Sequence, residues 1–329
     1  MAEQLLDLYS TPPAENPVWI SDGILPRGGI LLIGGYAKVG KSFLLLDLIH
    51  GLATGSKVWG HFTVPEPTTV LYLDFEIGKV ALQQRVKWRY DTLKTPPPKG
   101  MYYLSRPKQM FLDTAGGASA LAREIEETGA KVVVVDPLSR CMLGQENDAA
   151  DVGRLFRHLD ELLASYEDLS FVLSHHLGKP PKEDALLDEF SPYRLRGSSR
   201  FFDCPDAIAI VHKGMLASPG ELWRLKIGFE LRQAASPPAL KLAVMDGGLI
   251  QPVKSSRLPQ SVSKEVNHQE QKRPAQKQDQ KYDIDEKSDP VPHVRNFITP
   301  WSAGTSLQAA KSRALLGNLP RKSPPEQVS

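Results

Sequence analysis

The sequence predicts an α/β fold built on a mostly parallel central sheet. Short apolar runs alternate along the chain with stretches of helical spacing, which is typical of strands joined by crossover helices. One apolar run, 29–34, leads into the glycine-rich stretch GGYAKVGKS at 34–42, and a helical run begins at Ser42. Strand, glycine loop and helix in this order place backbone N–H groups at a helix N-terminus, where they bind phosphate. The fold prediction therefore brings a phosphate site with it.

The glycine-rich loop matches the pattern G-x-x-x-x-G-K-[ST] between Gly35 and Ser42. In this pattern the Lys41 ammonium reaches the β- and γ-phosphates of a nucleotide, and the Ser42 hydroxyl ligates Mg²⁺. The alternative is a glycine-rich turn with a solvated lysine. The predicted nucleotide-binding residues are Gly35, Tyr36, Ala37, Lys38, Val39, Gly40, Lys41, Ser42 and Phe43.

The composition is that of a soluble globular protein. The 329 residues are 41% hydrophobic and 24% charged, and the net charge of +2 gives no bulk signature of nucleic-acid binding. No run approaches the roughly 18 apolar residues of a membrane span, so no membrane partner is expected. The N-terminus is acidic where a signal peptide is basic. Two cysteines, Cys141 and Cys204, fit a reducing compartment, so the expected location is cytoplasmic.

The chain divides into an N-terminal arm at 1–16, a folded body at 17–253 and a low-complexity tail at 254–329. The tail holds 13 Lys or Arg against 8 Asp or Glu, a net charge of +5, which leaves −3 for the rest. Few apolar residues are available to offset its ordering entropy, so the tail is expected to be disordered. A helical pattern at 306–316 is either a short docking helix or a marginal surface helix.

Residues that end the apolar runs are site candidates, because parallel sheets bind ligands beyond the carboxyl ends of their strands. The run 68–75 ends in Glu76, and the run 131–135 ends in Asp136. The aspartate is expected to hold Mg²⁺, usually through water. Many P-loop motors carry a glutamate directly after it, but Pro137 stands here. Glu76 is therefore the candidate general base, and a solvated glutamate that only ends a strand is the alternative.

A third run, 169–174, ends in His175 and His176. Polar side chains at this point can sense a γ-phosphate by hydrogen bonding and pass that state to the next loop. A metal site is not expected there, because no Cys/His partner pattern occurs elsewhere. Two later runs, 222–227 and 239–244, are expected to close the sheet as antiparallel strands.

The ordered series of motifs resembles a RecA-type P-loop ATPase, and more narrowly the RepA-like branch that includes plasmid replicative helicases. The resemblance covers roughly residues 17–253. Besides the phosphate loop, it is carried by WISDGILPRGG at 19–29, YLDFE at 72–76, VDP at 135–137, END at 146–148, SHH at 174–176 and RGSS at 196–199.

The resemblance implies a RecA-like P-loop NTPase core and a hexameric ring that binds ATP with Mg²⁺ between its subunits. It further implies the phosphate-loop roles for Lys41 and Ser42, the catalytic base for Glu76, the metal aspartate for Asp136, the γ-phosphate sensor for His176 or His175, and an arginine acting in trans, Arg200 or Arg232. One departure is Tyr36, which is expected to leave a bulky ring near the phosphates.

The first functional hypothesis is a DNA-stimulated ATPase of the helicase type, acting on single-stranded DNA through the loops 140–148 and 179–196. The second is a regulatory or assembly ATPase, a nucleotide-dependent switch that separates no strands. A small-molecule kinase is the third, and Glu76 together with the motif at 196–199 argues against it. The tail is a candidate for binding a replication partner.

Overall fold

The computed structural model describes residues 4–12, 17–179, 188–215 and 217–253. Its main sheet comprises β3 (Ile30–Gly35), β4 (Val70–Asp74), β5 (Met101–Ser105), β6 (Val132–Asp136), β7 (Ser170–His176), β8 (Ala207–Lys213), β9 (Trp223–Leu231), β10 (Leu240–Val244) and β11 (Ile250–Pro252). A separate two-stranded ribbon is formed by β1 (Val18–Ile20) and β2 (Leu25–Pro26). The helices are α1 (Leu5–Ser10), α2 (Lys41–Thr54), α3 (Lys79–Leu93), α4 (Ala115–Thr128), α5 (Ala149–Ser165) and α6 (Arg200–Asp203). The predicted tail at 254–329, with its helix at 306–316, lies outside the described residues.

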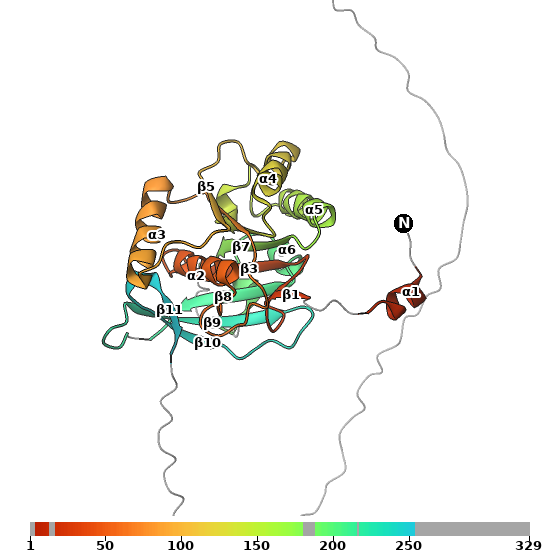
Figure 1. The fold of residues 1–329 in the computed structure, drawn as a ribbon. Coiled ribbons are helices and arrows are strands. Elements are labelled where there is room, and N and C mark those ends of the chain that lie inside the picture. The colour runs from red at the N-terminus through yellow and green to blue at the C-terminus, as the bar shows by residue number, and fades with distance from the viewer. Residues whose placement is uncertain (1–3, 13–16, 180–187, 216, 254–329) are drawn as a thin grey trace, which may run out of the picture. The chain divides into compact units, whose positions relative to one another are not determined.

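The nine strands of the main sheet have the order β11-β10-β9-β8-β3-β7-β6-β4-β5 (Figure 1). From β8 to β5 in this order, each strand runs parallel to the next. At the other side, β9, β10 and β11 add in antiparallel pairs. The structure therefore confirms the mostly parallel sheet, and it confirms the two late runs as antiparallel strands.

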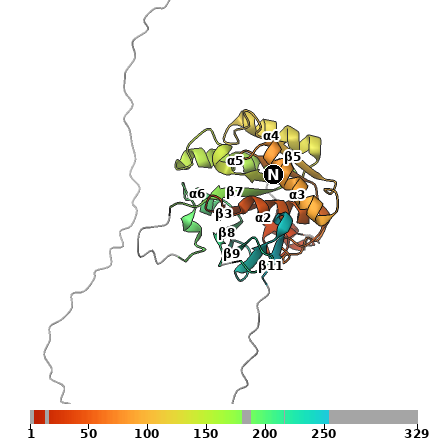
Figure 2. The same ribbon diagram turned by 90° about the vertical axis from the view of Figure 1, so that its left-hand side faces the viewer.

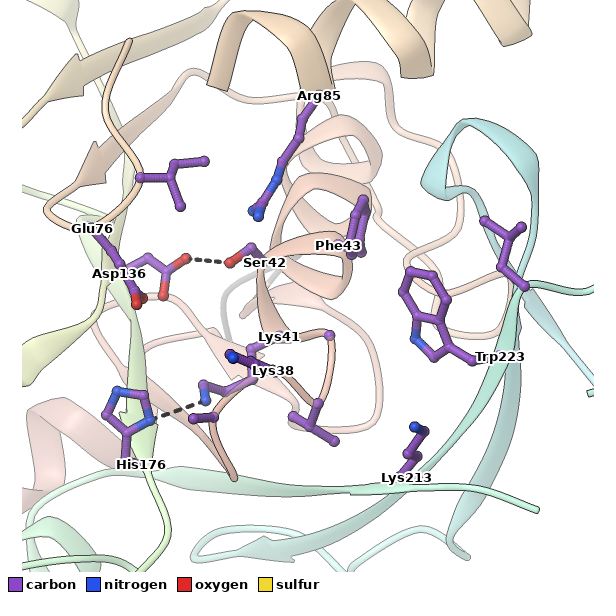
Figure 3. A pocket seen from close by; sticks show the side chains of 15 residues that line it. Lys38, Lys41, Ser42, Phe43, Glu76, Arg85, Asp136, His176, Lys213 and Trp223 are labelled. Carbon is purple, nitrogen blue, oxygen red and sulfur yellow. Dashed lines mark hydrogen bonds between the residues drawn. The ribbon is translucent and has the colours of Figure 1, made fainter. Parts of the chain in front are cut away.

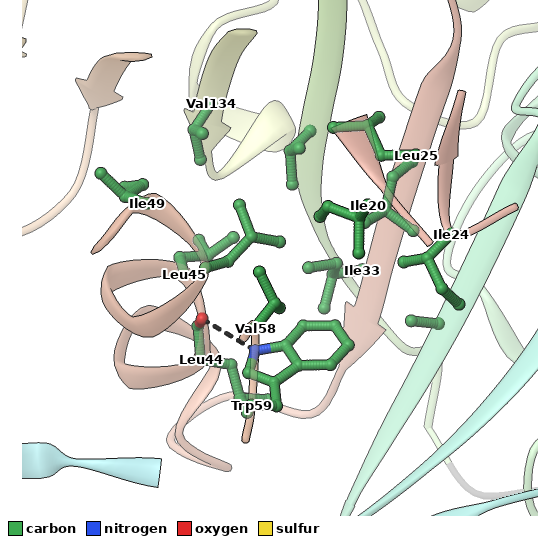
Figure 4. Close-up of a cluster of buried hydrophobic side chains, with 14 of the residues drawn as sticks. Ile20, Ile24, Leu25, Ile33, Leu44, Leu45, Ile49, Val58, Trp59 and Val134 are labelled. Carbon is green, nitrogen blue, oxygen red and sulfur yellow. Dashed lines mark hydrogen bonds between the residues drawn. The ribbon is translucent and has the colours of Figure 1, made fainter. Parts of the chain in front are cut away.

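Both faces of the sheet are buried, which explains why its strands read as continuous apolar runs. In β3, Leu31 and Ile33 belong to the core beneath α2, whereas Ile30 and Leu32 belong to the core beneath α4 and α5. Figure 2 shows α4 and α5 lying together on one side of the sheet. In the core beneath α2, the Trp59 indole N–H donates to the Leu44 carbonyl at 3.0 Å (Figure 4).

The helix α2 begins and ends at glycines with positive φ. Gly40, just before the first helical residue, has φ 116°, and Gly55 ends the helix with φ 73°. Residues with a side chain rarely adopt a positive φ. These two glycines therefore let the chain turn sharply from β3 into the helix and out of it again. The predicted helix after the phosphate loop is confirmed, and it begins at Lys41.

Two findings concern membrane-spanning helices and the state of the cysteines. Among the described residues, no helix is both long and apolar enough to cross a bilayer. Both cysteines are free thiols, with Cys141 buried and Cys204 half-buried. Burial raises the pKa of the Cys141 thiol well above its ordinary value, which makes it a small core residue and not a nucleophile.

A buried ion pair joins α2 to α3. Arg89, only 3% exposed, donates from Nη2 to Asp47 Oδ1 at 2.8 Å. The second carboxylate oxygen accepts the Trp59 backbone N–H at 2.9 Å, so the aspartate holds two elements at once. Burial raises the pKa of Asp47, and Arg89 opposes that shift. Neither charge can be removed alone without leaving the other uncompensated.

We predict that Arg89→Met lowers the free energy of unfolding by about 3–5 kcal/mol, the usual cost of an unpaired buried charge. The loss should shrink as the pH falls toward the ordinary aspartate pKa, because a protonated Asp47 needs no cation. Denaturant unfolding over a pH series measures both effects. The matched control is Lys87→Met on the same helix, whose exposed pair with Asp91 should contribute less than about 1 kcal/mol. Equal losses in the two variants would contradict the prediction.

Candidate active site

A cavity of about 550 Å³ lies at the carboxyl ends of the parallel strands (Figure 3). The strand registers bring these ends to within two residues of one level, since Gly35 pairs with His176, Asp74 pairs with Asp136, and Val135 pairs with Leu173. The cavity is lined by residues 37–43 of the phosphate loop and α2, by Glu76 and Ile77 after β4, by Arg85 on α3, by Asp136, His176 and Lys213 at the ends of β6, β7 and β8, and by Leu222 and Trp223 at the start of β9.

Lys41 is held over the phosphate loop by backbone carbonyls. Its Nζ donates to the Gly35 carbonyl at 2.7 Å and to the Tyr36 carbonyl at 3.2 Å, and the residue is only 7% exposed. Burial lowers the pKa of the ammonium from 10.5 to about 8, against the opposing effect of the Asp136 and Glu76 carboxylates. An anion in the cavity would favour the charged form, so Lys41 and a phosphate group would stabilise each other.

Tyr36 departs from the expectation of a bulky ring near the phosphates. Its ring lies edge-on against His212, with 5.8 Å between the ring centroids, and it packs on the core beneath α4 and α5. Gly35 and Tyr36 are absent from the lining of the cavity, to which the loop contributes from Ala37 onward. Both residues reach the site only through the carbonyls that hold Lys41.

Ser42 and Asp136 meet at the floor of the cavity. The Ser42 hydroxyl and the Tyr72 hydroxyl each donate to Asp136 Oδ2 at 3.0 Å. Burial, followed by the nearby carboxylates, raises the pKa of Tyr72, so its phenol stays a donor. Among the hydrogen bonds of the described residues, none reaches the other oxygen, Oδ1. One carboxylate beside one hydroxyl is a donor set that suits Mg²⁺, which takes its remaining oxygens from phosphate and water.

Glu76 follows directly after β4 and turns its side chain into the cavity. Figure 3 shows it on the same side of the cavity as Asp136 and His176. Its carboxylate lies near enough to affect the pKa of both Lys41 and His176. Within the described part of the chain, no hydrogen bond occupies this carboxylate, and Pro137 supplies no acid at the neighbouring strand end. Among the described residues that line the cavity, Glu76 therefore offers water a carboxylate with neither oxygen hydrogen-bonded.

The two adjacent histidines face opposite sides of β7. His176 lines the cavity with Nδ1 3.4 Å from Lys41 Nζ, and burial together with Lys41 lowers its pKa. His175 is fully buried, and its Nε2 donates to the Arg196 carbonyl at 2.7 Å. Its ring lies 4.2 Å from that of Phe201, and burial lowers its pKa to about 4. Of the two candidates for the phosphate sensor, His176 is the one at the cavity.

The two candidate trans arginines lie outside the cavity of their own chain. Arg200 begins α6 and lies against Gly153 of α5, where an added Cβ would meet its Nε at 3.3 Å. Arg232 follows β9 and donates to the Asp203 carbonyl. Neither arginine therefore contributes to the cavity of its own chain, and a role in trans stays a prediction.

The two loops predicted to contact DNA meet each other in space. Arg196 donates from Nη2 to Glu146 Oε2 at 2.9 Å, and the Ser198 backbone N–H donates to the Glu146 carbonyl at 2.9 Å. Tyr193 is 67% exposed, and its ring packs against Phe202 with 4.7 Å between the ring centroids. Part of the second loop, 180–187, lies outside the described residues.

Three residues that line the cavity were not identified from the sequence: Arg85, Lys213 and Trp223. Lys213 ends β8, so the rule used for the other strand ends would have found it. Trp223 begins the antiparallel strand β9, and the start of this strand lies at the edge where the parallel strands end. A search limited to strand ends therefore misses it. Arg85 has a buried Nη1 without a partner among the described residues, and no sequence pattern signals it.

Comparisons with known proteins identify the family of the chain. The model of a family described as an AAA domain matches residues 2–182, which is more than half of the chain. No curated protein matches the sequence. Among solved structures, the KaiC-like protein PH0186 from the hyperthermophilic archaeon Pyrococcus horikoshii OT3 is 11% identical, with a TM-score of 0.48 over 72% of this chain and 94% of that chain. The phosphate loop, Glu76, Asp136 and His176 all lie within the residues that the family model matches, and the chain belongs to this AAA domain family of RecA-type P-loop ATPases.

Proposed function

We propose that this chain is an ATP-hydrolysing motor that acts on single-stranded DNA, in the manner of the RepA-like helicases. The observation that carries the hydrolytic part is the gathering of Lys41, Ser42 with Asp136, Glu76 and His176 around one cavity. A nucleotide-binding protein that only holds its ligand does not need an unpaired glutamate beside the phosphate site. Glu76 is the group that turns a binding site into a hydrolytic one.

The hydrolytic step follows from these positions. The phosphate loop and Lys41 hold the β- and γ-phosphates, and Ser42 with Asp136 would hold Mg²⁺, which when bound neutralises phosphate charge. Glu76 accepts a proton from water as the water oxygen forms its bond to the γ-phosphorus. The bond from that phosphorus to the departing ADP oxygen breaks, which leaves ADP and phosphate. His176, 3.4 Å from Lys41, hydrogen-bonds a γ-phosphate oxygen and registers its loss.

The apolar end of the cavity suits the base of the nucleotide. Trp223 lies edge-on to Phe43 with 5.3 Å between ring centroids. The Arg85 guanidinium carbon lies 5.2 Å from the centroid of the Phe43 ring. A purine placed here would contact aromatic side chains and a cation while its phosphates reach Lys41.

The DNA-binding part of the proposal rests on the surface formed by residues 140–148 and 188–196. The two segments contain an exposed ring for base stacking, Tyr193, and two basic residues, Arg140 and Arg196. This is a thin set of basic and aromatic residues. The charge of −3 that the sequence gives to residues 1–253 favours the second candidate, a regulatory or assembly ATPase that separates no strands. The basic tail is assigned to partner binding on its sequence alone.

The two candidates differ in their response to single-stranded DNA. For the motor we expect ATP turnover to rise when a single-stranded oligonucleotide is added, because DNA bound at the loops acts on the strand end that carries His176. For the switch we expect no rise. Phosphate release measures the difference. Lys41→Ala should lower both rates by about 10²-fold or more. The control Lys57→Ala, an exposed lysine beyond α2, should change neither.

We predict that Glu76→Gln retains ATP binding and loses turnover by about 10²–10⁴-fold, the scale of a general base. Calorimetric titration measures the binding, and single-turnover kinetics measure the chemical step. Glu127→Gln, an exposed glutamate on α4, serves as the control for the loss of one carboxylate. If affinity collapsed while bound ATP were still hydrolysed, Glu76 would be a binding residue and the base would lie elsewhere.

A ring with shared sites predicts complementation between two inactive proteins. Arg200→Ala and Arg232→Ala are each mixed with Lys41→Ala, so that an intact Lys41 can meet an intact arginine from its neighbour. We expect partial recovery of turnover for the arginine that acts in trans and none for the other. Light scattering of the same mixtures gives the oligomeric state. A fully active monomer would refute both the ring and the trans arginine.

A further inference from the structure

The loop between β4 and α3, which carries Glu76, is organised around one buried carboxylate. Asp74 is 1% exposed, and its Oδ1 accepts the backbone N–H groups of Glu76 at 3.0 Å and Ile77 at 2.9 Å. Its Oδ2 accepts the backbone N–H of Gly78 at 2.8 Å. Three consecutive backbone donors therefore converge on a single side chain, and such charge-assisted hydrogen bonds are about twice as strong as neutral ones.

A second charged side chain holds the same loop from the opposite direction. The Arg106 guanidinium donates to the Glu76 carbonyl from Nη2 at 2.7 Å and from Nε at 3.3 Å. Arg106 lies just beyond the edge strand β5, and its own backbone N–H donates to the Asp74 carbonyl at 2.6 Å. The hydroxyl of Ser105, the last residue of β5, donates to Asp74 Oδ2 at 3.2 Å. The edge strand is thus tied to the Glu76 loop at several atoms.

The close approach of Arg106 requires glycine at position 78. Gly78 has φ 79°, and a Cβ added there would lie 3.2 Å from both Cζ and Nε of Arg106. Gly78 precedes the first residue of α3, and it offers that helix no side-chain cap. The buried Asp74 carboxylate does not replace that cap, because the N–H groups that it accepts belong to residues 76–78, before the helix begins.

The result is a residue whose backbone is fixed on both sides while its side chain has no hydrogen-bond partner among the described residues. Glu76 donates its N–H to Asp74 and accepts at its carbonyl from Arg106. Its carboxylate is left for the cavity. A general base on a freely moving loop would be misplaced for much of the time, and an error of about 1 Å can cost about 10²-fold in rate.

We infer that Asp74 and Arg106 are positioning residues that hold the Glu76 carboxylate at the site of water activation. This rests on the proposed role of Glu76 in ATP hydrolysis. Neither side chain lines the cavity, so both act through the loop that they hold.

The first test is Arg106→Ala, chosen because Arg106 is exposed and its loss leaves the core untouched. We expect kcat for ATP hydrolysis to fall by about 10-fold to 100-fold, with KM and ATP affinity unchanged, because the lost contact affects only the reacting geometry. Arg106→Lys should restore part of kcat, since it returns one charged donor. The control is Lys108→Ala, which removes an exposed positive charge two residues away. A rise in KM at constant kcat would overturn the inference.

The second test separates positioning from a general structural effect. In single turnovers, Arg106→Ala in the background of Glu76→Gln should change the remaining rate by less than about 2-fold, because no base is left to position. If the double variant loses as much again as Arg106→Ala does alone, the arginine acts by another route and the inference is wrong. Asp74→Asn, with its unfolding transition recorded, should show the same pattern as Arg106→Ala.

The outcomes also distinguish this inference from the proposed function. If Glu76→Gln keeps full turnover, the proposed base is wrong, and the inference that depends on it is wrong as well. If Glu76→Gln is inactive while Arg106→Ala and folded Asp74→Asn hydrolyse ATP normally, hydrolysis by Glu76 stands and only the positioning inference is refuted.

Discussion

The parallel pairing of buried strands is the constraint on which the site depends. Gly35 pairs with His176, Asp74 pairs with Asp136, and Val135 pairs with Leu173, so the ends of these four strands stand within two residues of one level. Residues 132–135 are buried on both faces of the sheet, and a slip of one residue would exchange the two faces and pull Asp136 away from Ser42. The apolar interior of the sheet therefore fixes the polar geometry at its edge, and the chemical groups need no further scaffold of their own.

The cavity is arranged to gain from a ligand that carries both signs of charge. Lys41 and Asp136 are both largely buried, and burial lowers the pKa of Lys41. Without a ligand, backbone carbonyls satisfy the lysine, and two hydroxyls satisfy one oxygen of the aspartate. A nucleotide with its metal ion brings a polyanion to the first and a cation to the second. The same desolvation that lowers the pKa of Lys41 strengthens its attraction to that polyanion.

The fold and the centre of the site could be predicted from the sequence because both depend on local pattern. Apolar runs that end in Glu76, Asp136 and His175-His176 mark strand ends, and parallel strand ends share one edge. The choice between His175 and His176 depends on which way each side chain points from β7, which the pattern leaves open and the pairing with β3 decides. Trp223 and Arg85 could not be found this way. Trp223 lies at the start of an antiparallel strand, and Arg85 lies on the helix α3.

The surface proposed for DNA and the nucleotide cavity are joined through one strand end. His176 lines the cavity with its side chain, while its backbone carbonyl accepts the Arg196 N–H at 3.0 Å. Arg196 in turn pairs with Glu146, and its carbonyl holds the buried His175. A rotation of the chain at His176 cannot leave Arg196 in place, because the two residues share a backbone hydrogen bond. The segments 140–148 and 188–196 are therefore linked by hydrogen bonds to a residue that lines the cavity, which is the kind of connection that a motor or a switch on this fold requires.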